Sequence, residues 1–192
     1  MMPSIKGTRT EKNLLKSFAG ESQARNRYNF AAKVAKKEGY EQISALFLET
    51  AENERQHAKG FFKFLEGGMV EITAAYPAGV IGTTIENLKA AAAGEHEEHT
   101  QLYPEFARIA KEEGFPQIAS FYTLVANVEK HHEERYLMLL KTIEEDTTFK
   151  KSESVKWICR VCGHVHEGPE APSVCPCCNH PQAHFQLLTD CY

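Results

Sequence analysis

Apolar side chains in the first 146 residues recur at alternating steps of three and four positions, which is the spacing of one face of an α-helix. Breaks in this pattern divide it into four predicted helices, at residues 10–37, 41–66, 84–113 and 116–145. The segment 67–83 between the second and third helices contains glycines and a proline. Helices of this size are roughly 40 Å long, and a segment of this length can run alongside one. The pattern therefore predicts a four-helix bundle with one long crossover.

Residues at the ends of the predicted helices support these bounds. Thr8 and Glu11 fit a capping box at the first helix, and Pro116 suits the first position of the last helix. Gly39 and Gly114 stand where a helix commonly ends in a left-handed residue. Because both glycines are followed at once by a new helical pattern, each helix pair is predicted to be a tight antiparallel hairpin.

An internal repeat relates the two helix pairs. Residues 35–57 reappear in the same register at residues 110–132, which is 75 positions later. A period this long in a helical sequence indicates that each repeat unit is a pair of helices rather than one turn of a solenoid.

The predicted core-facing stripes contain acidic residues in all four helices. The stripes are Leu14, Phe18, Glu21, Ala24, Tyr28 and Ala31; Ile43, Phe47, Thr50, Glu54, His57, Phe61 and Phe64; Ile85, Leu88, Glu95, Glu98, Leu102 and Phe106; and Ile118, Tyr122, Val125, Glu129, His132, Tyr136 and Leu139. For any single glutamate, a solvent-facing position is the simpler interpretation. Five carboxylates buried together without counter-charge would cost many kcal/mol, and two divalent cations would leave them close to neutral.

These residue types indicate which metals the bundle would bind. Oxygen-rich ligands with one imidazole per metal suit iron or manganese better than a closed zinc site. One glutamate from each of two helices, together with Glu-x-x-His from each of the other two, is the pattern of di-iron carboxylate bundles. The predicted ligands are Glu21, Glu54, His57, Glu95, Glu98, Glu129 and His132. His131 is the closest rival to His132 but lies off the stripe, and the remaining histidines, His96 and His99 among them, are interpreted as solvated or structural.

One extra residue interrupts the repeat in the third helix. Glu21 and Glu95 are 74 positions apart, whereas Tyr28 and Tyr103 are 75 apart. An extra residue inside a helix indicates a π-bulge, which is often found at functional sites, so an irregular turn is predicted near residues 99–104. Glu98 has no carboxylate counterpart in the first repeat and is a candidate to compete with His57 for one metal.

All six cysteines lie within residues 159–192, in a short segment whose sequence is typical of β-strands. Cys159 and Cys162 form one C-x2-C pair and Cys175 and Cys178 another, which together predict a tetrahedral four-thiolate metal site. Zinc and iron both accept four thiolates, and the neighbouring two-metal domain favours iron, because such a site requires an electron supply. Cys177 and Cys191 are interpreted as free thiols, with Cys177 an alternative to Cys178.

Composition and charge exclude several classes of protein. The net charge of −4 gives no reason to expect a nucleic acid or an anionic membrane as partner. No apolar run approaches the roughly 20 residues that span a bilayer, and residues 1–20 lack the pattern of a signal peptide. We therefore expect a soluble, cytoplasmic protein.

The chain resembles the rubrerythrin family over essentially its whole length. The resemblance rests on Gly20–Tyr28 (GESQARNRY), Glu54-x-x-His57, Gly94–Glu98 (GEHEE), Glu129-x-x-His132 and the final cysteine pattern. It implies a ferritin-like bundle at residues 1–148 with two irons, bridged by Glu54 and Glu129, and a rubredoxin-like domain with one Fe(Cys)4 site at residues 149–192. Zinc substitution is possible at either site. Tyr28 and Tyr103 would either pack near the ligands or hydrogen-bond to them.

The resemblance also implies an activity and partners. It implies reduction of hydrogen peroxide to water, with electrons from rubredoxin or from a separate NAD(P)H-dependent reductase, in a homodimer. Three other functions remain open from the residues: a ferroxidase or iron-storage shell, a dimanganese catalase that needs no reductant, and a non-enzymatic zinc-ribbon adaptor. The attached cysteine domain favours electron delivery over the first two.

Overall fold

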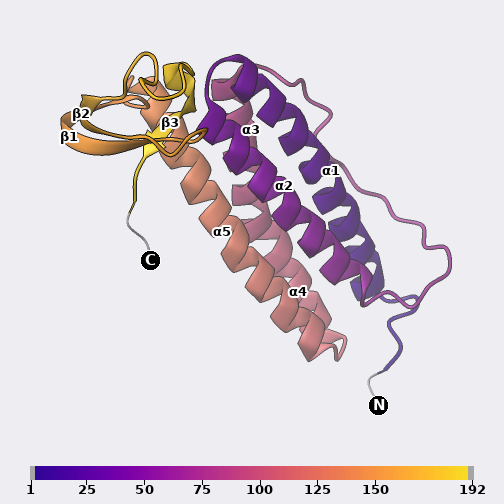
Figure 1. The fold of residues 1–192 in the computed structure, drawn as a ribbon. Helices are drawn as coiled ribbons and strands as arrows, with labels where there is room; N and C mark the ends of the chain where they lie inside the picture. Colours follow the sequence, from indigo (N-terminus) through magenta and orange to yellow (C-terminus); the bar gives the residue numbers. More distant parts are fainter. Residues whose placement is uncertain (1–2, 190–192) are drawn as a thin grey trace.

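The chain folds as an elongated helical bundle with a small β domain at one end (Figure 1). The structure is a computed structural model and describes residues 3–189. Helices α1 (Arg9–Lys37) and α2 (Glu41–Phe62) form one hairpin, and helix α5 (Pro116–Glu144) pairs with a composite rod. This rod consists of α3 (Thr84–Glu97), the π-helical turn η1 (Glu98–Leu102) and α4 (Tyr103–Glu112). The predicted four-helix bundle with one crossover is confirmed, and so is the predicted π turn.

Local hydrogen bonds explain the helix bounds and correct two details. Thr8 accepts a bond from the backbone N–H of Glu11, but the Glu11 carboxylate bonds to Gly7 rather than to Thr8, so the predicted capping box is incomplete. Gly39 and Gly114 have φ of 88° and 87°, as a left-handed helix end requires. The second helix ends at Phe62, four residues before the prediction, because 3₁₀-type bonds from Phe64 and Leu65 tighten its last turn.

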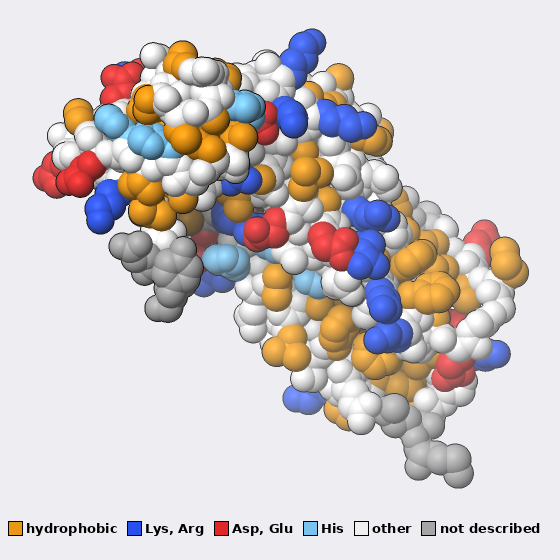
Figure 2. Space-filling view, in the orientation of Figure 1, with side chains coloured by type: hydrophobic (Ala, Val, Ile, Leu, Met, Phe, Trp, Pro, Cys, Tyr) orange, Lys and Arg blue, Asp and Glu red, His pale blue; other side chains and the backbone are white. Residues whose placement is uncertain are grey.

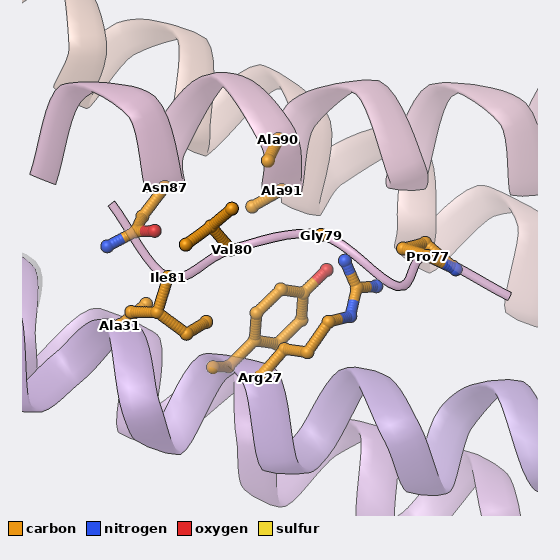
Figure 3. Close-up of a pocket in the computed structure, with 10 residues that line it drawn as sticks. Arg27, Ala31, Pro77, Gly79, Val80, Ile81, Asn87, Ala90 and Ala91 are labelled. Atoms are coloured by element: carbon orange, nitrogen blue, oxygen red, sulfur yellow. The ribbon is translucent and has the colours of Figure 1, made fainter. Parts of the chain in front are cut away.

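The crossover between α2 and α3 lies against α1. Tyr76 donates a hydrogen bond of 2.7 Å to the carbonyl of Lys16, and Gln23 donates one of 2.7 Å to the carbonyl of Pro77. A cavity of about 80 Å³ remains between the crossover, α1 and α3. Figure 3 shows the guanidinium of Arg27 pointing toward the crossover at this cavity. The crossover therefore covers the side of the bundle that α1 and α3 share.

Two apolar clusters fill the bundle and leave a polar layer between them. The first includes Tyr28, Ile43, Phe47, Leu88 and Tyr136, and the second includes Leu14, Phe61, Tyr103, Ile118 and Tyr122. Between them lie four fully buried glutamates and the buried His132. Burial of the flanking aromatic side chains supplies the hydrophobic free energy that holds these charged groups away from water.

The C-terminal domain is a three-stranded antiparallel sheet of order β2-β1-β3. The strands are β1 (Lys150–Cys159), β2 (Val165–Glu170) and β3 (Phe185–Leu187). Its small core includes Trp157, Ala171 and Phe185, and the Trp157 indole donates a bond of 3.1 Å to the carbonyl of Gly168. The predicted boundary between residues 148 and 149 falls between the end of α5 and the start of β1 and stays a prediction.

The sheet domain docks at the turn between α1 and α2. The rings of Tyr40 and Phe149 stack with centroids 6.2 Å apart, and His184 Nε2 lies 3.9 Å from Glu41 Oε1. Figure 2 shows acidic and basic side chains intermingled over this face of the bundle, and histidines both on the sheet domain and on the bundle. Within residues 3–189, no helix combines the length and the apolar character that crossing a membrane requires.

Candidate metal centres

Four helices contribute the side chains of the polar layer in the bundle. Helix α2 supplies Glu54 and His57, and helix α5 supplies Glu129 and His132. A glutamate and a histidine three positions apart project from the same face of a helix, so both members of each pair reach the interior. Glu21 of α1 and Glu95 of α3 complete the layer, and both are fully buried.

One group of donors gathers around His57. Its Nδ1 atom lies 2.8 Å from Glu54 Oε2, 2.9 Å from Glu129 Oε1 and 3.8 Å from Glu21 Oε2. Ligands at neighbouring corners of an octahedron with bonds of about 2.1 Å are about 3 Å apart. The spacing of this group therefore suits a single metal ion.

A second group gathers around His132 in the same way. Its Nδ1 atom lies 2.8 Å from Glu129 Oε2, 3.3 Å from Glu54 Oε1 and 3.8 Å from Glu95 Oε1. Glu54 and Glu129 belong to both groups and offer one oxygen to each. Two metal positions that share two carboxylates follow from this arrangement, with the near two-fold symmetry that the sequence repeat predicts.

The hydrogen bonding of these buried groups tests whether a metal fits. Side-chain atoms of all four glutamates and of His132 have no hydrogen-bond partner among the described residues: Glu21 Oε2, Glu54 Oε1, Glu95 Oε2, Glu129 Oε1 and Oε2, and His132 Nδ1. Buried polar atoms left unpaired are rare and costly. Because these lone pairs all point into one layer, cations coordinated there would satisfy them. The donor set thus fits two metal ions.

Two of the buried carboxylates, Glu21 and Glu95, resist ionisation. Burial raises the pKa of Glu21 well above its ordinary value, and the neighbouring charge of Glu129 adds to this. Burial and the charges of Glu54 and Glu129 do the same to the pKa of Glu95. Burial would also raise the pKa of Glu54, but the two imidazoles outweigh it and lower that pKa to about 2. The interior therefore needs positive charge to hold all its carboxylates ionised.

The two imidazoles are drawn toward their charged form. Burial lowers the pKa of His132, but the nearby carboxylates of Glu129 and Glu54 outweigh it and raise the pKa to about 9. Burial opposes charging of His57 in the same way, and the carboxylates of Glu129, Glu21 and Glu54 raise its pKa. Protons and metal ions compete for these nitrogens, because a metal binds the neutral imidazole.

Two tyrosines hydrogen-bond to the two glutamates that belong to only one donor group each, Glu95 and Glu21. The hydroxyl of Tyr28 donates a hydrogen bond of 2.6 Å to Glu95, and the hydroxyl of Tyr103 donates one to Glu21. Each tyrosine thus bonds to the glutamate of the other helix pair. Burial raises the pKa of both hydroxyls well above the ordinary value, and the charges of these glutamates add to it, so both tyrosines stay protonated donors.

Glu98 lies at the edge of the layer, in the π turn. It is half-buried and belongs to neither group of converging donors. Burial and the charges of Glu129 and Glu54 raise its pKa well above the ordinary value, and Arg27 opposes this. Glu98 and Tyr103 line a cavity of about 400 Å³ beneath the crossover, with Arg27, Tyr76 and Phe106. The sequence did not predict Arg27 or Tyr76 at the site, because this cavity forms only where the crossover, which carries Tyr76, packs against α1, which carries Arg27.

The π turn also corrects the predicted core of the third helix. Leu102 was predicted to face the core but has an exposed fraction of 36%, whereas Tyr103 is 2% exposed. The π turn has five residues, more than an α-helical turn. The residue that faces the core after the turn is therefore one position later in the sequence than regular α-helical spacing predicts. Tyr103 therefore takes the core position next to Glu21.

Four cysteines converge in the sheet domain. Cys159, Cys162, Cys175 and Cys178 form one potential metal-binding group, with Sγ atoms 3.7 Å apart in the pairs 159–178 and 162–175. A tetrahedron with metal–sulfur bonds of about 2.3 Å has edges of about 3.8 Å. Gly163 and Asn179 follow the two pairs in left-handed conformations, with φ of 77° and 59°.

Backbone N–H groups prepare this site for an anionic sulfur. Burial would raise the pKa of Cys175, but the N–H groups of Cys178 and Cys177 lower it to about 7. A bond from His180 lowers the pKa of Cys178, but burial and the neighbouring thiols raise it to about 12. Cys177 is exposed and outside the group, and Cys191 lies outside the described residues.

Known proteins share both parts of this arrangement. The family model Rubrerythrin matches residues 12–140, and the model for the rubredoxin-like domain of rubrerythrin matches residues 157–186. The chain is 59% identical to the rubrerythrin of Porphyromonas gingivalis, over all of this chain and 96% of the relative. It is 57% identical to that of Nitratidesulfovibrio vulgaris, over 97% of this chain and 98% of the relative.

Solved structures extend the comparison. Nigerythrin in a mixed-valent state matches with a TM-score of 0.62 and 28% identity, over 98% of both chains. A bacterioferritin of Mycobacterium tuberculosis matches with a TM-score of 0.63 at 17% identity, over 76% of this chain and 90% of that chain, which is a likeness of fold alone.

Fold and sites together define a ferritin-like protein with a di-iron carboxylate centre and a second, four-cysteine iron site in a rubredoxin-like domain. Such a pairing of metal sites belongs to the redox proteins. The chain is a member of the rubrerythrin family, which is an oxidoreductase family. The resemblance drawn from the sequence motifs is confirmed.

Proposed function

We propose that the chain is a peroxidase that reduces hydrogen peroxide to water and protects the cell from oxidative stress. The observation that carries the proposal is the pair of donor groups sharing Glu54 and Glu129, in one chain with the four-cysteine group. Cleavage of hydrogen peroxide to two waters consumes two electrons and two protons. Two ferrous ions held by the buried Glu/His layer would supply both electrons, and an iron held by the four cysteines would supply one at a time.

The residues of the bundle have distinct roles in this proposal. Glu54 and Glu129 would hold both irons. Glu21 and His57 would hold one of them, and Glu95 and His132 the other. Glu98 would be the alternative to His57 at the first iron, because a carboxylate oxygen suits ferric iron and a neutral imidazole suits ferrous iron.

Access of peroxide is proposed through the cavity beneath the crossover. This cavity reaches Glu98 and Tyr103, and its volume of about 400 Å³ exceeds the need of a small peroxide. Tyr76 and Gln23 hydrogen-bond the crossover to α1, so the crossover forms one wall of this cavity. Tyr103 and Tyr28 hold their glutamates by hydrogen bonds while charge at the metals changes.

Electron delivery is proposed to occur between two copies of the chain in a homodimer. The sheet domain docks beside Glu41, at one end of α2, whereas Glu54 lies 13 residues further along that helix. At 1.5 Å per residue, Glu54 lies roughly 20 Å along the helix from Glu41, where the sheet domain docks. A partner chain would bring a four-cysteine site closer. The electron donor to that site is proposed to be rubredoxin or an NAD(P)H-dependent reductase.

Anaerobic titration of the reduced, iron-loaded protein with hydrogen peroxide tests the proposal. We expect one peroxide to oxidise two ferrous ions in the bundle, with water as product and no oxygen evolved, and NAD(P)H with a reductase to restore the reduced state. Oxygen evolution without any reductant would instead identify a catalase. If the ferrous iron does not react, with metal content verified on the same sample, the proposed peroxidase activity is overturned.

The His57→Ala variant tests the proposed exchange at the first iron. Peroxide turnover should fall while the absorption of the four-cysteine iron stays unchanged. His131→Ala is the matched control, because His131 is exposed on the same helix as His132 but outside both donor groups. Equal turnover in the His57 variant and the control would remove His57 from the mechanism.

A further inference from the structure

A third group of potential metal ligands lies on the outside of the bundle. His96 of α3, His99 of η1 and Glu133 of α5 can place their ligand atoms within 4.8 Å of one another. His96 Nδ1 lies 3.0 Å from Glu133 Oε1, and His99 Nε2 lies 2.5 Å from Glu133 Oε2. Both oxygens of one carboxylate therefore face an imidazole nitrogen each. We propose that these three residues form a separate binding site for a single divalent transition-metal ion.

The position of the group follows from the helices that build the di-iron site. His96, His99 and Glu133 directly follow Glu95, Glu98 and His132 in the chain. Each next residue on an α-helix is turned by about 100° around its axis. The same helices therefore present one set of donors to the interior and the following residues to the groove between the α3–η1 rod and α5, which pack against each other.

The π turn contributes to this outer group. His96 is the penultimate residue of α3 and His99 is the second residue of η1. Their rings are nearly perpendicular, with centroids 5.4 Å apart, so both rings approach Glu133 without stacking on each other. The Thr100 hydroxyl bonds to the carbonyl of His96 and anchors the turn between them. The first helix has Ser22 and Arg25 at the equivalent places after Glu21 and Ala24, so the repeat contains the outer group once.

The donor set determines the class of cation. Two imidazoles and one carboxylate are the ligands of zinc sites that keep an open position, and they also bind ferrous iron. Magnesium and calcium prefer oxygen ligands and are disfavoured here. The side chain of His96 is 56% exposed, whereas those of His99 and Glu133 are 15% and 17% exposed. Two ligands are thus fixed in the groove, and water can reach the remaining coordination positions beside His96.

This site does not depend on peroxide reduction, and zinc binding to the iron-replete protein tests it. Isothermal titration with zinc chloride, with iron and zinc measured before and after, should show one further zinc ion per chain and an unchanged iron content. Magnesium chloride in excess should not compete. The His96→Ala/His99→Ala double variant should bind this zinc about 100-fold more weakly or worse, because loss of even an outer partner of a ligand costs about 10–100-fold.

The His131→Ala variant is the matched control and should bind zinc as the unaltered chain does. Crystals soaked in zinc chloride should place anomalous density between His96, His99 and Glu133. The site is overturned if the iron-replete chain takes up no zinc, if the double variant binds it equally well, or if zinc uptake matches iron loss. Helical circular dichroism and iron content equal to the unaltered chain verify that the double variant is folded.

Discussion

At the scale of single residues, the role of Tyr28 and Tyr103 is the part of the site that the sequence left open. The repeat pairs Tyr28 with Tyr103, and both packing and hydrogen bonding were consistent with that position. In the structure each hydroxyl bonds to the glutamate of the opposite helix pair. Sequence spacing places a residue on a helix face, but it does not say which partner across the core that residue will meet.

The Tyr103→Phe variant should weaken the site without unfolding the bundle. It removes the donor that Glu21 uses and leaves a buried acceptor unpaired, at a cost of about 1–3 kcal/mol. Loss of such an orienting bond typically lowers metal affinity or activity by about 10–100-fold. Iron content after dialysis against a chelator, together with peroxide turnover, measures the effect.

Tyr122→Phe is the control for this substitution. Tyr122 is equally buried and in the same apolar cluster, but its hydroxyl pairs with Ser17 rather than with a carboxylate of the site. Retention of iron and turnover by Tyr103→Phe at the level of Tyr122→Phe would assign Tyr103 a packing role only.

At the scale of elements, the π turn could be located from the sequence alone, by comparing the residue spacing in the two repeats. The extra residue between Glu95 and Tyr103 predicted an irregular turn, and η1 occupies residues Glu98–Leu102. The repeat also paired Tyr103 with the core residue Tyr28, and both are buried, whereas the regular spacing of the apolar stripe was wrong after the turn. Leu102 was placed in the core by regular α spacing, which no longer applies once the turn has five residues.

Deletion of Thr100 should convert η1 to regular α-helix and impair the site selectively. With Thr100 removed, Tyr103 follows Glu95 by seven positions, the spacing of Tyr28 after Glu21, so it stays on the core face. Glu98 and His99 lose the backbone direction that the π turn gives them. We expect an unchanged helical circular dichroism signal and a peroxide turnover lower by about tenfold or more.

The control for this deletion is Thr100→Ala, which removes the hydroxyl bond to His96 but keeps the residue count of the turn. Turnover in the deletion variant equal to that of Thr100→Ala would show that the π turn is dispensable for the reaction. A crystal structure of the deletion variant identifies the helix type directly.

At the scale of the whole molecule, two domains with separate metal sites were predictable, but their docking was not. The cysteine spacing and the change from a helical to a β-strand sequence pattern define the second domain. Its contacts with the bundle, such as the stacking of Tyr40 on Phe149, join residues far apart in the sequence that no repeat or motif links. Such contacts depend on surface shape, which a one-dimensional pattern does not contain.

The sheet domain should unfold alone when its metal is removed. Its core is small, so the metal supplies much of its stability. Trp157 is the single tryptophan of the chain and is buried in this domain, so its fluorescence reports on this domain only. Cys162→Ser should shift the Trp157 emission to longer wavelength and leave helical circular dichroism intact. Cys177→Ser, a control outside the cysteine group, should change neither signal.

The metal-free protein should lose stability as pH rises, and iron should remove this trend. Glu21 and Glu95 have a raised pKa in the fold, so the folded state binds more protons than the unfolded chain. The free energy of unfolding then falls as pH rises above about 4.3, the ordinary pKa of a glutamate. The pKa of His132, raised to about 9, acts in the same direction, because its contribution is lost as pH rises toward that value.

Glu54 does not offset this trend. Its pKa is lowered to about 2, so its stabilising contribution is already complete above the ordinary value and stays constant as pH rises further. The melting temperature of the metal-free bundle should therefore fall between about pH 5 and pH 9, whereas that of the iron-loaded bundle should change little, because iron replaces the protons. Calorimetry of both forms across this range decides the matter, and parallel pH profiles would contradict a metal-binding role for the buried carboxylates.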